Sequence, residues 1–102
     1  MVTANRIYLI FRPALAQALG MDASSTRLEC YFTPGETLAD VLALLAARDQ
    51  AIARRVYNLE ERRVNSLVQI AVNGRLLPLT GGIDAPLHDG DEVLVFYAAS
   101  GG

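Results

Sequence analysis

The fold of this 102-residue chain is decided by the stretch TLADVLALL at residues 37–45. Its apolar side chains recur at the i, i+3, i+4, i+7 spacing of an amphipathic helix: Leu38, Val41, Leu42 and Leu45. Thr37 and Asp40 resemble a capping box, in which each side chain binds the backbone N–H of the other, with Asp in place of the usual Glu or Gln. The spacing therefore predicts a helix that begins after Thr37 and buries one face.

The segment that follows this helix admits two interpretations. Asp49 is suited to cap a second helix, because a carboxylate there accepts hydrogen bonds from the first-turn N–H groups. Ile52, Val56 and Leu59 continue the helical spacing, so a single long helix over residues 37–59 is the alternative. The sequence leaves both interpretations open.

Two apolar runs before the helix predict strands. Residues 6–12 (RIYLIFR) are apolar on both alternating faces, so this strand is either covered on both faces or offers one face for docking. Residues 27–32 (RLECYF) alternate, and Cys30 lies on their apolar face as a small core residue rather than a reactive thiol. We expect the two strands to pair antiparallel, with a helical turn at residues 14–19 between them.

A hairpin is predicted after the helix. Residues 66–72 (SLVQIAV) read as a strand, and the Asn73-Gly74 pair that follows favours a tight turn because both residues tolerate positive φ. A short strand over residues 75–79 completes the hairpin. Pro78 confines that strand to a sheet edge, because proline has no backbone N–H to donate.

The last strand is predicted over residues 92–98, after an Asp-Gly turn at residues 89–90. If its valines face the helix, Leu94 and Phe96 face outward and form an apolar patch for partner docking. The alternative is that a loop or the second helix covers them. The acidic turn at residues 88–92 is interpreted as a solvated loop, because it is too compact and too short of ligands for a calcium site.

The predicted order is strand, strand, helix, strand, short strand, strand. One main helix packed on one face of a mixed sheet of about five strands is the α+β arrangement called the β-grasp. The first and last strands are expected to lie side by side in the middle of the sheet. Residues 1–102 are expected to form a single domain with a flexible tail over residues 98–102.

Composition excludes several classes of function. A formal net charge of −2 and a pI of about 5.2 argue against nucleic-acid or anionic-membrane partners, and no apolar run approaches the ~20 residues that span a bilayer. A single cysteine allows no internal disulfide and fits a reducing cytoplasm. All nine basic residues are arginine, so copies of the chain cannot be joined through lysine side chains. The sequence offers no nucleophile–base pair or metal cluster, so neither catalytic nor metal-binding residues are predicted.

The sequence ends in Ser100, Gly101 and Gly102, immediately after the last apolar strand. A terminal carboxylate is ionised at neutral pH and is a poor electrophile until it is activated, for example as an acyl-adenylate. Glycine places nothing bulky beside that carbonyl and accepts most backbone conformations. The tail therefore suggests a protein whose own carboxyl terminus is the reactive group.

Five motifs occur together in a specific order: PGETLADVL at residues 34–42, VNGR at 72–75, Pro-Leu at 86–87, DGDEV at 89–93 and the final Gly-Gly. With these motifs the chain resembles the ubiquitin-like sulfur carriers, the MoaD/ThiS family of the molybdopterin synthase small subunit and the thiamine sulfur carrier. The resemblance covers most of the chain. It depends on the order and spacing of the motifs rather than on any one of them.

The resemblance implies that an E1-like enzyme adenylates the carboxylate of Gly102 with ATP and magnesium. Sulfur from a persulfide donor then displaces AMP, and the resulting thiocarboxylate delivers sulfur to an acceptor enzyme such as a large synthase subunit. The chain would bind no permanent cofactor and act as a cosubstrate rather than an enzyme, although it could be counted as the small subunit of a sulfurtransferase complex such as molybdopterin synthase.

The acceptor is expected to be of the molybdopterin type rather than the thiamine type, because residues 48–65 are longer than in the shortest thiamine carriers. Residues 97–100 nevertheless lack the prolines often found before Gly-Gly in molybdopterin synthase small subunits. Two alternatives remain: a ubiquitin-like modifier conjugated through Gly102 to target lysines, and a binding module whose tail is inert.

Overall fold

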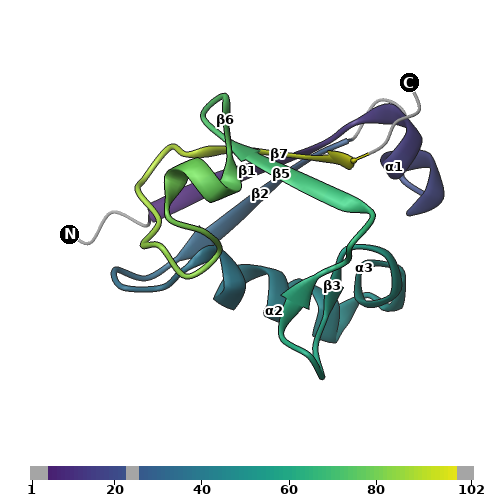
Figure 1. The fold of residues 1–102 in the computed structure, drawn as a ribbon, viewed down its shortest axis with the longest axis horizontal. Coiled ribbons are helices and arrows are strands. Elements are labelled where there is room, and N and C mark those ends of the chain that lie inside the picture. The colour runs from purple at the N-terminus through teal and green to yellow at the C-terminus, as the bar shows by residue number, and fades with distance from the viewer. Residues whose placement is uncertain (1–4, 23–25, 99–102) are drawn as a thin grey trace.

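The computed structural model describes residues 5–22 and 26–98. Five strands form one mixed sheet in the order β2 (Arg27–Phe32), β1 (Asn5–Phe11), β7 (Glu92–Tyr97), β5 (Val68–Val72) and β6 (Arg75–Leu76) (Figure 1). The central pair, β1 and β7, is parallel, and the other pairs are antiparallel. The predicted mixed sheet, with its first and last strands side by side in the middle, is confirmed.

The main helix, α2 (Leu38–Arg48), lies on one side of the sheet (Figure 1). Its capping box is formed: the Thr37 N–H donates to Asp40 Oδ2 at 2.9 Å, and the Asp40 N–H donates to Thr37 Oγ1 at 3.3 Å. Both contacts satisfy N–H groups that have no partner within the helix. The α+β class, with one main helix on one face of the sheet, is therefore confirmed.

A separate helix, α3 (Gln50–Arg55), follows, so the single long helix is the wrong alternative. Asp49 breaks the run because its backbone is extended, with φ −134° and ψ 112°. Its Oδ1 accepts a hydrogen bond from the Ala51 N–H at 2.9 Å and caps α3, as predicted.

The hydrophobic core lies between α2 and the sheet face that it covers. That face of the sheet contributes Ile7, Leu9, Phe11, Val68, Ile70, Val93 and Val95, and α2 contributes Leu38, Val41, Leu42 and Ala46. The opposite side chains of β1, Tyr8 and Ile10, are only half-buried. Thus β1 is covered on one face only, and we call the sheet side away from α2 the outer face.

The region before β5 contains structure that the sequence did not predict. A short hairpin pairs β3 (Tyr57–Asn58) with β4 (Arg63–Val64), and its loop holds Leu59, which is exposed and lies outside any helix. The helical spacing assigned to Leu59 was therefore wrong. Because each strand has only two residues, neither shows the alternation by which strands are recognised.

The edge of the sheet also differs from the prediction of a strand over residues 75–79. The strand β6 ends at Leu76, and a 3-10 helix, η1 (Leu77–Thr80), replaces the rest. Pro78 lies in the first turn of η1, where its fixed φ suits a helix and its missing N–H leaves no bond unmade. The missing backbone N–H of Pro78, from which an edge strand was predicted, is therefore also the reason that the strand ends early.

A short helix, α1 (Pro13–Ala18), connects β1 to the loop before β2, as the predicted helical turn required. Leu15 and Ala16 are buried, and the Arg12 carbonyl accepts the Ala16 N–H at 2.8 Å.

Within the described ranges, no helix is both long enough and apolar enough to cross a membrane.

Candidate functional site

The strand β7 lies at the centre of the sheet and alternates its side chains as predicted. Val93 and Val95 are completely buried against the core. Leu94 and Phe96 lie on the outer face and are half-buried. The structure thus leaves both side chains partly accessible, and their role in partner docking stays a prediction.

Apolar side chains of both neighbouring strands lie beside Leu94, whereas the β5 neighbour of Phe96 is polar. In the strand register Leu94 lies opposite Ile10 of β1 and Ala71 of β5, while Phe96 lies opposite Gln69. Directly paired residues share a face of the sheet. We call Ile10, Ala71, Leu94 and Phe96 the apolar centre of the outer face.

The β2 side of the outer face is polar. Arg6 Nη1 lies 3.1 Å from Glu29 Oε2, and the Tyr31 hydroxyl donates to Glu29 Oε1 at 2.9 Å. This hydrogen bond to the Glu29 carboxylate raises the pKa of Tyr31. All three side chains are exposed, so the contacts contribute little stability, but they leave the charges of Arg6 and Glu29 mutually compensated.

A second arginine on this side is also compensated. The Arg27 guanidinium lies 4.3 Å from the centre of the Tyr8 ring, within the range of a cation–π contact. Its Nη2 lies 3.8 Å from Glu92 Oε2. The first contact joins the neighbouring strands β2 and β1, and the second spans β1 to reach β7, so together they orient the Arg27 side chain beside the apolar centre.

The parallel strands β1 and β7 leave the sheet at the same end, where the predicted reactive tail begins. The Arg12 N–H donates to the Val95 carbonyl at 3.0 Å, and the Ala98 N–H donates to the Leu67 carbonyl at 2.8 Å. The described chain ends with Ala98, so the predicted site residues of the tail lie outside the described residues: Ser100, Gly101 and Gly102. The structure defines the residues from which the tail starts, Tyr97 and Ala98, which we call the tail root.

The other end of β7 is held by a buried carboxylate that sequence reasoning missed. Asp91 is only 8% exposed, and it accepts hydrogen bonds from Asn73 Nδ2 and from the His88 N–H, both at 2.9 Å. Asn73 also accepts the Glu92 N–H through Oδ1 at 2.9 Å and donates its own N–H to the Glu92 carbonyl at 2.8 Å. The interpretation of residues 88–92 as a solvated loop is therefore wrong for Asp91.

Asn73 performs two tasks at this position. Its φ of +51° begins the tight turn of the β5–β6 hairpin, as the Asn-Gly pair predicted. Its side chain then joins this hairpin to the turn before β7. The signal was present in the sequence, since two of the recognised motifs, at residues 72–75 and 89–93, supply the two partners of this contact.

Cys30 packs against the core and is half-buried, in agreement with its predicted structural role. Burial raises the pKa of the Cys30 thiol. Because the thiolate is the nucleophilic form, a raised pKa makes this cysteine less reactive at neutral pH. Cys30 is thus poorly suited to relay sulfur.

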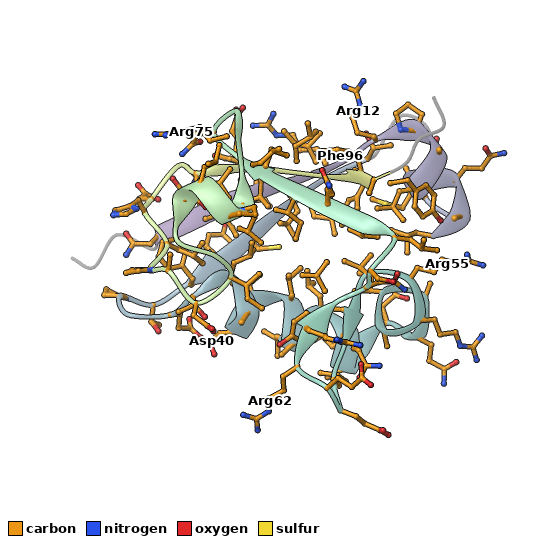
Figure 2. The ribbon with its side chains drawn as sticks, in the orientation of Figure 1. Arg12, Asp40, Arg55, Arg62, Arg75 and Phe96 are labelled. Carbon is orange, nitrogen blue, oxygen red and sulfur yellow. The ribbon has the colours of Figure 1, made fainter. Side chains whose placement is uncertain are left out.

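The side of the molecule that carries α2 offers a different surface. A hollow of about 610 Å³ opens between α2 and the β3–β4 hairpin. Its lining includes Asp40 and Arg62, whose side chains are labelled in Figure 2. Among the residues that the structure describes, no three histidine, cysteine or acidic side chains cluster in a way that could hold a metal ion. The outer face and the tail root therefore remain the candidate site.

A mixed sheet with β1 and β7 parallel at its centre and one main helix across one face defines a ubiquitin-like β-grasp protein. Residues 23–102 match the sequence model of the ThiS family, so the chain belongs to this family. The resemblance to the MoaD/ThiS proteins drawn from the motifs is confirmed. A search of curated proteins found no match.

Solved structures share this fold over nearly the whole chain. The HVO 2177 protein of Haloferax volcanii is similar at 26% identity with a TM-score of 0.73, covering 97% of this chain and 88% of its own. A putative molybdopterin converting factor subunit 1 from Pyrococcus furiosus has 24% identity and a TM-score of 0.67, covering 93% and 99%. The Amycolatopsis orientalis BexX/CysO complex contains a chain at 20% identity with a TM-score of 0.67, covering 94% and 99%.

Proposed function

We propose that this protein is a sulfur carrier whose reactive group is the carboxylate of Gly102. The observation that carries the proposal is that the ThiS family match extends to Gly102, the last residue of the sequence. The fold supports it, because the central strand β7 leads directly into the tail and its outer face carries an accessible apolar centre beside the tail root. Binding of that face would direct the tail into a partner.

The proposed chemistry takes place in an E1-like partner that binds ATP and magnesium. An oxygen of the Gly102 carboxylate attacks the α-phosphorus of ATP, pyrophosphate leaves, and an acyl-adenylate forms. The terminal sulfur of a protein persulfide attacks the acyl carbon, and AMP leaves with the electrons of the broken C–O bond. A second thiol of the donor then cleaves the S–S bond, which gives the Gly102 thiocarboxylate and a disulfide on the donor.

The role of this chain is to place the Gly102 carboxylate in the partner, and it contributes no catalytic side chains. Five residues follow Tyr97, ending in Gly102, a reach of about 16 Å at ~3.3 Å per residue. Such a segment can enter a narrow channel while the folded body stays on the surface of the partner. The protein is thus a cosubstrate, and we place its ATP-dependent activation in the cytoplasm.

For the acceptor we favour an enzyme of the molybdopterin synthase type over a thiamine pathway enzyme. Residues 48–65, which are longer than in the shortest thiamine carriers, contain α3 and the β3–β4 hairpin. These elements enlarge the body on the α2 side and leave the outer face unobstructed. The large synthase subunit would then receive the thiocarboxylate tail from a carrier docked through its apolar centre.

The proposal is tested by ATP–pyrophosphate exchange with the E1-like enzyme of the same organism. We expect Gly102→Ala to lower exchange roughly tenfold to a hundredfold, because the added methyl displaces the reacting carboxylate. Stability should change by no more than about 0.5 kcal/mol, since the change is at a chain terminus. Exchange at the wild-type rate would overturn the proposal.

A matched control uses the exposed Gln50 at the start of α3, on the α2 side of the molecule. Gln50→Ala removes a polar side chain far from the outer face, so exchange should stay within about twofold of wild type. If Gln50→Ala and Gly102→Ala lower exchange equally, the loss has a cause other than the tail carboxylate.

A further inference from the structure

The arginines near the apolar centre differ in whether a neighbouring carboxylate balances their positive charge. Arg6 is paired with Glu29, and Arg27 is paired with Glu92 and stacked on Tyr8. Arg12 is exposed and makes no ion pair with any residue that the structure describes. Among residues 5–22 and 26–98, Arg12 is thus the arginine of the outer face, beside the apolar centre, that no carboxylate compensates.

The backbone of Arg12 is held rigidly at the tail root. Its N–H donates to the Val95 carbonyl at 3.0 Å, its carbonyl accepts the Ala16 N–H at 2.8 Å, and Pro13 follows it as the first residue of α1. Bonds to β7 on one side and to α1 on the other leave only the side chain free to adapt. The backbone of Arg12 therefore loses little further freedom on binding, and the entropic cost falls on the side chain alone.

The side chain of Arg12 belongs to the outer face. It follows the last paired residues of β1 and β7, Phe11 and Val95, and alternation places it on the same side as Ile10. Figure 2 shows its guanidinium projecting from the sheet on the side away from α2. In the register it comes next to Phe96, so the charge borders the apolar centre at the end where the tail leaves.

From this placement, and resting on the proposed function, we propose that Arg12 binds a carboxylate of the adenylating enzyme on the rim of the channel that receives the tail. The partner surface would consist of an apolar cleft for Leu94 and Phe96, bordered by an aspartate or glutamate. The guanidinium matches a carboxylate in planar, two-bond geometry, which makes it suited to an interface ion pair.

Two anions in the complex could attract Arg12: a carboxylate of the partner protein and the phosphates of ATP. Their distances from the tail root distinguish them. The nucleotide must meet the Gly102 carboxylate, which a fully extended tail places up to about 16 Å from the root. Arg12 lies at the root and is fixed there by its backbone bonds. An extended tail carries the reacting carboxylate away from Arg12, which in this proposal contacts the protein surface around the channel as a docking and specificity residue rather than a catalytic one.

The test measures exchange and binding with Arg12→Ala, Arg12→Lys and Arg12→Glu against the wild-type adenylating enzyme. We expect Arg12→Ala to raise KM and Kd roughly fivefold, and Arg12→Glu to raise them at least about twentyfold, because a like charge then faces the partner carboxylate. Arg12→Lys should retain more of the affinity than Arg12→Ala, since it keeps the charge. The differences should shrink in high salt, and kcat should fall much less than KM rises.

Arg75→Glu is the matched control, because it makes the same change of charge at an exposed arginine of the β5–β6 hairpin. That hairpin lies at the start of β7, and Arg12 lies at its end. We expect Kd within about twofold of wild type for Arg75→Glu. Equal weakening by Arg75→Glu and Arg12→Glu, or no weakening by Arg12→Glu, would overturn the inference while wild-type exchange still supports the proposed function. Absence of exchange with the wild-type carrier would overturn both.

Discussion

Asn73 and Asp91 show how two residues far apart in the sequence set the position of the central strand. Asn73 donates to the Asp91 carboxylate and also binds the backbone of Glu92 in both directions. Asp91 is buried, so its carboxylate depends on these donors in place of water. The start of β7 is therefore tied to the β5–β6 hairpin, and this tie fixes which residues of β7 face outward.

We expect Asp91→Ala to lower the free energy of unfolding by about 1–3 kcal/mol, because it leaves the Asn73 amide and the His88 N–H without their partner. Asn73→Gly separates the two tasks of Asn73, since glycine keeps the positive φ of the turn but removes both side-chain bonds. It should cost a similar amount. Urea unfolding measures both changes.

Asp84→Asn provides the control for these variants, because Asp84 is an exposed aspartate in a neighbouring loop. It should shift stability by no more than about 0.5 kcal/mol. Equal small effects at Asp84 and Asp91 would show that the buried network contributes nothing to the stability of the fold.

At the scale of the elements, the strand β7 combines two functions through its alternation. Val93 and Val95 fill the core beneath α2, while Leu94 and Phe96 remain accessible on the outer face. Because the period is two, neighbouring residues of one strand are predicted to respond to the same substitution in opposite ways.

Val95→Asp should unfold the protein, because it places a carboxylate without a partner in the apolar core. Leu94→Asp should leave the fold intact, because its side chain already reaches solvent, and it should weaken binding to the adenylating enzyme at least about tenfold. Circular dichroism and calorimetric titration check the two outcomes. A folded Leu94→Asp variant that binds normally would remove the apolar centre from the docking surface.

Elements with a strong period could be predicted from the sequence, and this covered most of the fold. The Leu38–Leu45 spacing with its Thr37 cap predicted α2, Asp49 predicted the start of α3, and Asn73-Gly74 predicted the hairpin. Each of these signals is local: the residues that form the interaction lie within a few positions of one another.

Elements that depend on distant contacts could not be predicted. The β3–β4 hairpin has two residues in each strand, too few to show a period, and β6 gives way to η1 after Leu76. The burial of Asp91 depends on Asn73, which lies 18 residues away and comes close only when β5 and β7 pair. For the candidate site, the alternation of β7 was readable from sequence, whereas the uncompensated charge of Arg12 emerged only when the partners of Arg6 and Arg27 were known.

At the scale of the whole molecule, the two sides of the sheet differ, and the tail leaves the sheet at one end of β7. The buried core, α2 and α3 lie on one side of the sheet, and the other side carries the apolar centre and Arg12 beside the root of the tail. Under the proposed function, the body presents the last strand to a partner and the carboxylate of Gly102 is the reactive group. Because the chain has no lysine, a product in which copies of it are joined through lysine side chains is excluded chemically.

The most direct test of the sulfur-carrier function is the intact mass of the protein after reaction with its E1-like enzyme, ATP, magnesium and a persulfide donor. We predict a free protein heavier by the difference between one sulfur and one oxygen atom, with the added mass on the peptide that ends in Gly102. Omission of ATP should abolish this change. An unchanged mass under conditions where the enzyme is active, or covalent adducts with other proteins in place of the thiocarboxylate, would contradict the account.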